Sequence, residues 1–546
     1  MEGAERRVPE WLLLVGIALL TFAVYSPALG FDFVYDDYAQ IVETKQLNSW
    51  HMLPRYFSGH VWAWKTPGVP GPYYRPVFLV WLLLNQTLFG LSAPFWHLTS
   101  IVTHVAATLL VYAVAKSLTG RTATAAITAL LFGVHPVHIE SVAWISGITD
   151  PLAAVFLLGS FLAFARNKPA LSYLLFALAL LEKEIAIVLP LLLLAYAWLF
   201  ERRALRAVTA YFLIAMIYLG VRLAVLHELS MTITPMALRD MLKTWPSLLV
   251  FYFRHLAWPS GLSAFYNLPV IQKVDLAGFW LPCAILAPIA VALAWFGWRS
   301  RTVAFAAAIL LIPILPALNL RTFARVETVH DRYLYLPVMG FCLLIALALR
   351  TQWALAIPLA AALSFATVNQ EQYWKDNVSL FLRGVEIAPN NEIANQCLGT
   401  ALLLRHQLPE AMPYYQRALE LNPNMFEALY SLGRIYYELG EYAKAEPYFE
   451  RAIASNGMYS YPYLYYGMAK MKEGKLHDAE QVLRYAVRIK GPDDYREFHL
   501  ALGLVLKAKG DRAGALREFE SEVHENPDPA KALREIAALK AAPATR

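Results

Sequence analysis

The amino-acid sequence predicts an all-α protein, with a polytopic membrane domain followed by a solenoid of helical repeats. Of the 546 residues, 58% are hydrophobic and 16% are charged, whereas soluble domains carry about 25% charged residues. Apolar runs fill residues 1–370, and many reach the roughly 20 residues that a helix needs to cross a bilayer. Residues 392–529 instead repeat with a period of 34. Together these observations predict a membrane domain and a repeat domain.

We predict eleven membrane spans. The first follows Arg6 and Arg7 and lacks a small-residue cleavage signature, so it is interpreted as an uncleaved span and not as a signal peptide. Two further apolar stretches, 76–90 and 238–258, are short or carry charges, which favours interfacial or re-entrant helices. The predicted spans are residues 11–29, 94–116, 122–137, 149–166, 169–182, 184–200, 204–226, 277–297, 302–320, 333–349 and 352–369.

The basic residues indicate orientation and do not indicate nucleic-acid binding. The net charge is only +6, and the positive charge is concentrated in short loops between apolar runs. With Arg6 and Arg7 in the cytoplasm, eleven crossings place the C-terminal domain on the outer side; a crossing by 238–258 would reverse that side. The loops assigned to the outer side hold most acidic, histidine and aromatic clusters, and the longest is the outer loop 30–93. Short loops and alanine-rich spans favour a bacterial plasma membrane.

The repeats match the tetratricopeptide pattern, in which small residues allow paired helices to approach and large residues fill grooves. Recurring positions are Gly399, Gly433, Gly467 and Gly503; Ala411, Ala445, Ala479 and Ala515; and Tyr415, Phe449, Leu483 and Phe519. We predict a capping or linker helix in 374–391, four repeats in 392–529 and a tail in 530–546. Such an array serves either as a scaffold or as a surface that holds a polypeptide.

Two adjacent carboxylates, Asp36 and Asp37, follow the first span. Carboxylates at a membrane exit are costly to desolvate, so they need a partner or a role. A solvated turn is the alternative interpretation, but the aromatic residues on both sides disfavour it.

Several segments, in this order along the chain, resemble those of the transmembrane-and-tetratricopeptide O-mannosyltransferases of the GT-C membrane glycosyltransferase superfamily. The chain departs from the family at Asp150, which lacks the preceding Arg that is often found there, and at Asp331, where Glu is common. The matching segments are Tyr35-Asp36-Asp37, Tyr74-Arg75-Pro76, Leu88-Phe89-Gly90-Leu91 with Phe95-Trp96-His97-Leu98, Leu131-Phe-Gly-Val-His135-Pro136-Val-His138-Ile-Glu140-Ser-Val-Ala-Trp144, Lys183-Glu184 and Asp331-Arg332-Tyr333, followed by the repeats.

The resemblance implies transfer of a sugar, typically mannose, from a polyprenyl-phosphate carrier to a hydroxyl. A hydroxyl needs a positioned base, and a carboxylate can serve. The leaving phosphate is a stable anion, which favours a single base and inversion; retention would require a second carboxylate as nucleophile. We predict Asp36 as the base and Asp37 as the residue that orients it or helps to hold a divalent metal ion. The reverse assignment of these two roles also fits the sequence.

The donor phosphate requires cations, and the predicted ones are Arg332, Arg75 and Lys183. Arginine suits bidentate phosphate contacts. The alternatives are snorkelling of Arg332 to the interface and a self-neutralising turn around Lys183. The remaining predicted substrate-binding residues are His135, His138, Glu140, Glu184, Asp331 and Tyr333.

Other roles stay open for some of these residues. His135 and His138 have a spacing that resembles a metal pair, although Pro136 interrupts the helix. Asp150 begins the fourth span, where an N-terminal carboxylate caps a helix. No metal is certain, and a divalent ion is the one cofactor considered.

The predicted partners are a polyprenyl-phosphate-linked sugar, a protein or peptide acceptor held by the repeats, and membrane lipids, but no nucleic acid. Two alternative functions remain at this point. One is a transferase that modifies a lipid or cell-wall glycan, and the other is a non-enzymatic membrane scaffold for an envelope complex.

Overall fold

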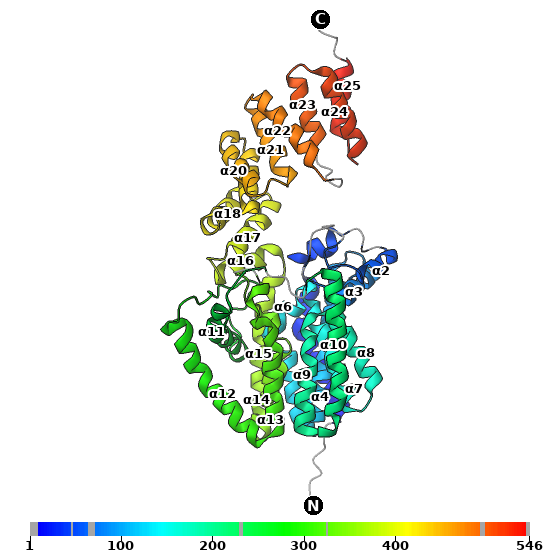
Figure 1. Ribbon diagram of the computed structural model, residues 1–546, viewed down its shortest axis with the longest axis vertical. Coiled ribbons are helices and arrows are strands. Elements are labelled where there is room, and N and C mark those ends of the chain that lie inside the picture. Colours follow the sequence, from blue (N-terminus) through cyan, green and yellow to red (C-terminus); the bar gives the residue numbers. More distant parts are fainter. Residues whose placement is uncertain are drawn as a thin grey trace, which may run out of the picture. The chain divides into compact units, whose positions relative to one another are not determined.

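The computed structural model describes residues 9–44, 47, 49–63, 71, 73–228, 233–323, 326–491 and 497–541. The chain divides into two compact units, Met1–Ala388 and Pro389–Arg546 (Figure 1). Every regular element in the described residues is a helix. The predicted all-α fold is therefore confirmed.

Seven helical segments of the N-terminal unit are long and apolar enough to cross a membrane, by length and composition over the described residues. Each corresponds to a predicted span. The prediction for 122–137 corresponds to a bent pair, Thr122–Gly133 and Pro136–Val142, with a bend of 50° where Pro136 cannot continue the helix. The seven are Glu10–Gly30, Ala93–Thr119, Ile145–Ala165, Arg202–Leu226, Leu276–Arg299, Arg301–Leu318 and Trp353–Trp374.

Three of the predicted spans are shorter helices of 10 to 17 residues: Pro169–Glu182, Glu184–Phe200 and Pro337–Thr351. The count of eleven crossings therefore stays a prediction. The two segments that we predicted to be interfacial or re-entrant are the helices α3 (Pro76–Phe89) and α11 (Leu238–Ala257), and neither is among the seven segments.

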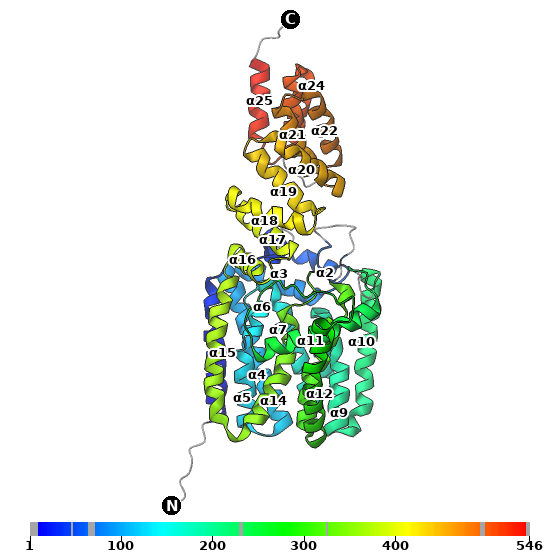
Figure 2. The same ribbon diagram turned by 90° about the vertical axis from the view of Figure 1, so that its left-hand side faces the viewer.

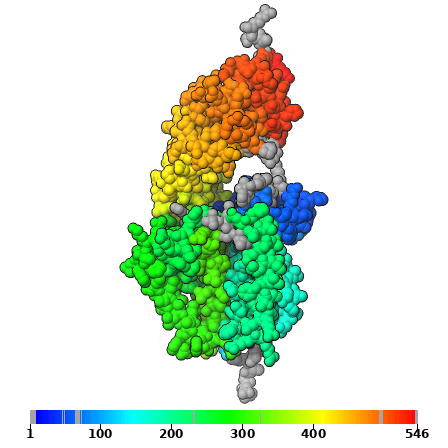
Figure 3. Space-filling view, viewed as in Figure 1, coloured from blue at the N-terminus to red at the C-terminus, as the bar shows by residue number. Residues whose placement is uncertain are grey.

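The helices of this unit pack around α4, which contacts α1, α5 and α7. Figure 2 shows α15 running beside α1, and these two helices are also in contact. In the space-filling view of Figure 3, α10 forms the surface on one side and α11 and α12 form it on the other. The bounds are α1 Glu10–Tyr25, α4 Ala93–Thr119, α5 Thr122–Gly133, α6 Ile139–Val142, α7 Thr149–Ala165, α8 Pro169–Glu182, α9 Leu189–Phe200, α10 Leu205–Leu226, α12 Leu281–Arg299, α13 Arg301–Leu311, α14 Pro337–Ala348, α15 Ala356–Glu371 and α16 Asn377–Ile387.

The loop between α1 and α4 folds into short helices over one end of the unit. In Figure 1, α2 (Leu53–Tyr56) and α3 lie at the end opposite to the start of α1. Buried apolar side chains such as Phe33, Tyr56 and Trp96 join this loop to the helices. The described part of this loop is thus packed against the helices through a hydrophobic core that both share.

Short 3-10 and π elements connect the helices and carry several polar residues. Their bounds are η1 Ser26–Gly30, η2 Tyr38–Val42, η4 Trp50–Met52, η5 Pro136–His138, η6 Ile145–Ile148, η7 Glu184–Val188, η8 Arg202–Ala204, η9 Leu276–Trp280, η10 Ile312–Leu318, η11 Leu320–Thr322, η12 Asp331–Leu334, η13 Leu349–Thr351, η14 Trp353–Leu355 and η15 Gln372–Trp374.

The C-terminal unit consists of paired helices, as the period of 34 predicts. In each pair the recurring glycine lies against the recurring large residue of the same repeat: a Cβ added at Gly433, for example, would lie 2.7 Å from the Phe449 ring. Phe449 also contacts Tyr465 of the next repeat. The large residues therefore pack within their own repeat as well as across to the neighbour. The helices are α17 Glu392–Leu404, α18 Leu408–Leu421, α19 Phe426–Glu438, α20 Tyr442–Ser455, α21 Ser460–Lys472, α22 Leu476–Ile489, α23 Phe498–Ala508 and α24 Arg512–Glu525.

Residues 530–541 lie in the segment predicted as a tail, but they form a helix, α25 (Ala530–Ala541), that contacts α24. Ala532 and Leu539 are buried on its inner face. This helix covers the apolar side of the last repeat, which otherwise would face water.

Gly340 allows α14 and α13 to touch through their backbones, and its replacement tests this packing. A Cβ at Gly340 would lie 2.4 Å from the amide nitrogen of Leu310 and 2.5 Å from the carbonyl oxygen of Ala306. Backbone atoms cannot move aside locally, so we expect Gly340→Ala to destabilise the unit by about 1–3 kcal/mol, measured as a lower melting temperature in detergent. Gly16→Ala is the matched control, because no atom lies within 4 Å of its added Cβ; equal melting temperatures for the two variants would contradict the packing.

Candidate active site

A cavity of about 510 Å³ lies within the N-terminal unit and is lined by charged and aromatic side chains. The lining comes from the loop after α1, the start of α3, the turn between α8 and η7, α10, η10 and η12. Residues that are almost 300 positions apart therefore meet around one space. Its charged lining residues are Asp36, Arg75, Lys183, Glu184, Arg222 and Arg332, and its aromatic ones are Trp62, Tyr73, Phe78, Trp144, Tyr218, Phe323 and Tyr333.

The two adjacent carboxylates have different environments. Asp36 is half-buried and lines the cavity. Asp37 is completely buried: its Oδ1 accepts hydrogen bonds from the Ser146 amide (2.8 Å) and hydroxyl (2.5 Å), and its Oδ2 accepts one from the Val34 amide (3.0 Å). Burial raises the pKa of Asp37 to about 7, although these hydrogen bonds favour the ionised form. Asp37 thus holds the backbone around Asp36.

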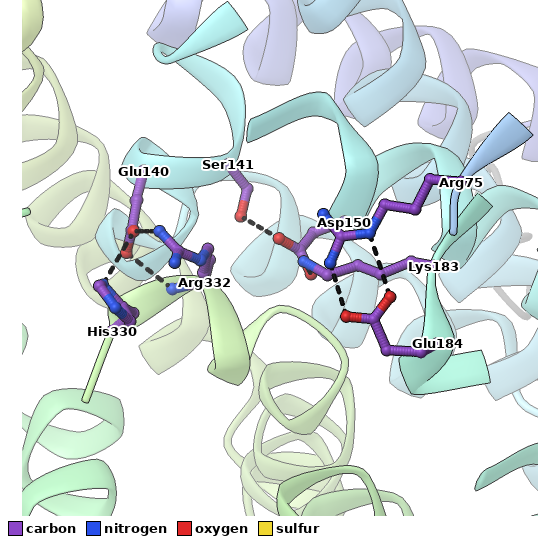
Figure 4. Close-up of polar contacts among 8 residues, drawn as sticks. All are labelled: Arg75, Glu140, Ser141, Asp150, Lys183, Glu184, His330 and Arg332. Carbon is purple, nitrogen blue, oxygen red and sulfur yellow. Dashed lines mark hydrogen bonds and ion pairs between the residues drawn. The ribbon is translucent and has the colours of Figure 1, made fainter. Parts of the chain in front are cut away.

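Arg75 and Glu184 form a bidentate ion pair at the cavity wall (Figure 4). The Arg75 Nε and Nη2 donate to the Glu184 Oε2 and Oε1 at 3.1 and 2.6 Å. Arg75 precedes Pro76, the first residue of α3, so the start of this helix fixes its backbone. Two parallel hydrogen bonds fix the plane of the guanidinium.

Lys183 lies at the break between α8 and η7, and its ammonium donates to Asp150 Oδ1 at 2.6 Å. Both side chains are at least 95% buried, and burial lowers the pKa of Lys183 while Asp150 opposes that shift. Asp150 lies in the first turn of α7, as expected for a carboxylate at a helix N-terminus, but the N-cap residue is Ile148 and the helix has no side-chain cap. Instead the carboxylate neutralises Lys183 (Figure 4).

Glu140 orients Arg332. Its Oε2 accepts the Arg332 amide at 3.0 Å, and its Oε1 lies 2.5 Å from the Arg332 Nη1 and 3.6 Å from the His330 Nδ1. The guanidinium carbon also lies 5.5 Å from the ring centre of Trp144. Of these two residues, only Arg332 lines the cavity. Glu140 therefore affects the cavity by fixing the position of the arginine.

Asp331 and Tyr333, on either side of Arg332, point to different places. Tyr333 lines the cavity. Asp331 is buried and accepts a hydrogen bond from the Tyr266 hydroxyl at 2.5 Å, and burial raises its pKa well above the ordinary value.

His135 and His138 are buried in the helix packing and are not part of the cavity lining. His135 accepts the Val137 amide at the start of η5, and its Nε2 lies 3.1 Å from the Leu256 carbonyl oxygen. The His138 ring packs against Phe132 and Tyr335. Among the described residues, no three His, Cys, Asp or Glu side chains gather as a metal-binding group.

Several lining residues were missed by the sequence analysis. Arg222 is a buried arginine inside a predicted span, and a charge inside an apolar helix is itself a signal of function. Ser146, Tyr73 and Tyr218 carry no comparable signal. Arg321, which precedes η12 in the same part of the chain, donates to the Met236 carbonyl and does not line the cavity.

The tetratricopeptide repeat family matches residues 398–460. The chain is 26% identical over 429 residues to "Protein O-mannosyl-transferase F38B6.6" of Caenorhabditis elegans, covering 73% of this chain and 61% of the relative. It is 25% identical over 475 residues to "Protein O-mannosyl-transferase TMTC3" of Homo sapiens, covering 76% and 51%. A shorter match of 161 residues to "Protein O-mannosyl-transferase TMTC1" of Homo sapiens is 34% identical and covers 28% and 18%.

These relatives confirm the resemblance to the O-mannosyltransferase family that the motifs predicted. The chain spans about half to three fifths of the length of the first two curated relatives. Among solved structures, the chain is 20% identical to YrrB, "a TPR protein with an unusual peptide-binding site", covering 31% of this chain and 85% of that one with a TM-score of 0.27.

The raised pKa of Asp37 predicts how stability depends on pH. An aspartate titrates near 3.8 when unperturbed and near 7 here, so between these values the folded protein holds more protons than the unfolded chain, and its stability falls as pH rises. We expect the melting temperature of wild type minus that of Asp37→Asn to decrease from pH 4 to about pH 7 and to stay constant at higher pH. A difference that stays constant, or increases with pH, would contradict this environment.

Proposed function

We propose, from the similarity to protein O-mannosyl-transferases, that this chain is a membrane glycosyltransferase that moves mannose from a polyprenyl-phosphate carrier to a hydroxyl of a protein acceptor. The observation that carries the proposal is the cavity in which the half-buried Asp36 and the cations Arg75, Lys183 and Arg332 line one space. Such a space can hold a sugar phosphate between a base and positive charges.

In this proposal Asp36 is the general base. A serine or threonine hydroxyl is a weak nucleophile, and a carboxylate that accepts its proton during attack increases the rate by about 10²–10⁴-fold. Asp37 is unsuited to this role, because it is completely buried and already accepts three hydrogen bonds. We therefore assign Asp37 to positioning and Asp36 to proton transfer.

The cations are suited to a phosphate leaving group. Arg75, Lys183 and Arg332 are each fixed by a carboxylate, from Glu184, Asp150 and Glu140 respectively. A cation held in place before the reaction stabilises developing negative charge without further reorganisation. The departing phosphate is already an anion and needs no proton, so these residues suffice for its departure.

The arrangement favours inversion at the anomeric carbon. Retention requires a second carboxylate that attacks the sugar from the opposite face. In the part of the chain that the structure describes, Glu184 is the one carboxylate besides Asp36 that lines the cavity, and both of its oxygens accept hydrogen bonds from Arg75. A direct attack by the acceptor, activated by Asp36, is the simpler reaction for this geometry.

The repeats are proposed to hold the acceptor polypeptide, and the membrane helices to hold the carrier lipid. Tyr218, Leu219 and Arg222 of α10 line the cavity together with Pro316 and Ala317 of η10. Both elements lie in candidate membrane spans, so the cavity adjoins apolar helices beside which a polyprenyl chain can lie. We place the cavity and the repeats on the outer side of a bacterial plasma membrane.

Replacement of the proposed base tests the chemistry. We expect Asp36→Asn to lower the rate of mannose transfer from polyprenyl-phosphate mannose to a peptide acceptor by about 10²–10⁴-fold, because the amide cannot accept the proton. The melting temperature should stay near that of wild type. The matched control is Asp32→Asn, which changes an exposed carboxylate of the same loop; full activity in Asp36→Asn would exclude Asp36 as the base.

Neutralising the Glu140–Arg332 pair tests phosphate binding. The double variant Glu140→Gln with Arg332→Gln leaves no unpaired buried charge, so a large loss of stability is avoided. A ligand that binds the folded state raises the melting temperature. In the double variant, we expect the rise in melting temperature caused by polyprenyl-phosphate mannose or by bare polyprenyl phosphate to be less than half of the rise in wild type. Unchanged shifts for both lipids would remove Arg332 from the phosphate site.

A further inference from the structure

The residue before the proposed base has an unusual backbone conformation. Tyr35 has a φ of +54°, a left-handed conformation that bulky side chains rarely adopt. Such a conformation persists only where surrounding contacts fix it, and it is typical of functional sites. The contacts that fix Tyr35 therefore also determine where Asp36 points.

One of these contacts comes from the far end of the N-terminal unit in sequence. The amide of Tyr35 donates to the Asn377 Oδ1 at 2.8 Å. Asn377 is the first residue of α16, and Asp376 caps this helix by accepting the Ser379 amide at 2.9 Å. The cap sets the start of the helix, and the Asn377 side chain reaches back to the loop after α1.

The same helix also contacts the Tyr35 side chain. The Tyr35 ring lies 5.8 Å from the ring of Phe381, one turn further along α16, in an edge-to-face arrangement. Phe265 and Trp144 surround the ring at 5.8 and 5.9 Å. α16 thus holds both the backbone and the side chain of the residue that precedes Asp36.

We propose that Asn377 is a positioning residue for the transfer reaction: by accepting the Tyr35 amide, it fixes the left-handed turn that directs Asp36 into the cavity. This proposal rests on the proposed function, in which Asp36 is the base. Asp37 holds the turn from the other side through Ser146 and Val34. The helix that leads out of the N-terminal unit thereby becomes part of the active site.

The test replaces the acceptor atom. In Asn377→Ala we expect kcat for mannose transfer from polyprenyl-phosphate mannose to fall tenfold or more, with the donor KM within about twofold of wild type, because the base is misplaced while the phosphate site is intact. Asn377→Asp retains an oxygen at the Oδ1 position and should restore kcat to within about threefold. Ser379→Ala is the matched control. Like Asn377→Ala, it removes the Asn377-Val378-Ser379 acceptor sequence for N-glycosylation, but it keeps the hydrogen bond from the Tyr35 amide to Asn377, so it should behave as wild type.

Hydrogen–deuterium exchange of the full-length protein supplies a readout that is independent of turnover. The Tyr35 amide should lose protection in Asn377→Ala and keep it in Asn377→Asp and Ser379→Ala. Should Asn377→Ala fail to fold, Phe381→Leu takes its place, since it loosens the same turn through the Tyr35 ring, and the same fall in kcat is expected.

The outcomes separate the two proposals. Wild-type kcat in Asn377→Ala would overturn the positioning role, whatever the protection of the Tyr35 amide, as would a fall in kcat that Asn377→Asp does not restore. Absence of transfer by the wild-type protein would instead overturn the proposed function, whereas loss of Tyr35 protection in Asn377→Ala would still support the contact itself.

Discussion

The arrangement of the cavity depends on one buried carboxylate. Asp37 has no exposed surface; one of its oxygens joins the loop after α1 to η6 through Ser146, and the other fixes the turn of the same loop through the Val34 amide. A buried charge is tolerated only where hydrogen bonds replace its water shell. Removal of these hydrogen-bond donors would leave the buried Asp37 carboxylate without partners. The segment around Ser146 and the loop after α1 therefore stabilise each other, and this contact fixes the position of Asp36.

A second constraint is the pairing of every predicted donor-site cation. Ion pairs contribute little net stability, because water screens partly exposed pairs such as Arg75–Glu184 and desolvation offsets the attraction in buried pairs such as Lys183–Asp150. Arg75, Lys183 and Arg332 with their carboxylates are therefore better explained by orientation than by stability. The paired carboxylates also limit the net positive charge of the cavity before a phosphate enters, while the guanidinium planes and the ammonium stay in fixed positions.

The sequence predicted best those features that repeat or depend on length. The period of 34 located the paired helices because each repeat presents the same small and large residues. Arg75, Lys183, Glu184, Arg332 and Tyr333 were identified by resemblance, and the structure places all five on the cavity with Asp36. Contacts between residues far apart in sequence could not be predicted: Asn377 and Tyr35 are separated by 342 positions, and neither residue type indicates the other. The burial of His135 and His138 could not be predicted either, because their spacing in the sequence is compatible both with a metal pair and with packing inside the protein.

Breaks between the apolar helices explain both the short length of these helices and the position of several residues that line the cavity. Three of the predicted spans form apolar helices shorter than the roughly 20 residues that a full crossing needs. Two of the breaks beside them carry lining residues: Lys183 lies between α8 and η7, and Arg332 lies in η12 just before α14. Irregular backbone among apolar helices is tolerated where it is buried in protein or lines a polar cavity. A continuous helix would point successive side chains around its axis at 100° intervals, so adjacent polar residues could not all face one space. The interruption of these helices is what allows Lys183 and Glu184, and likewise Arg332 and Tyr333, to line the same cavity.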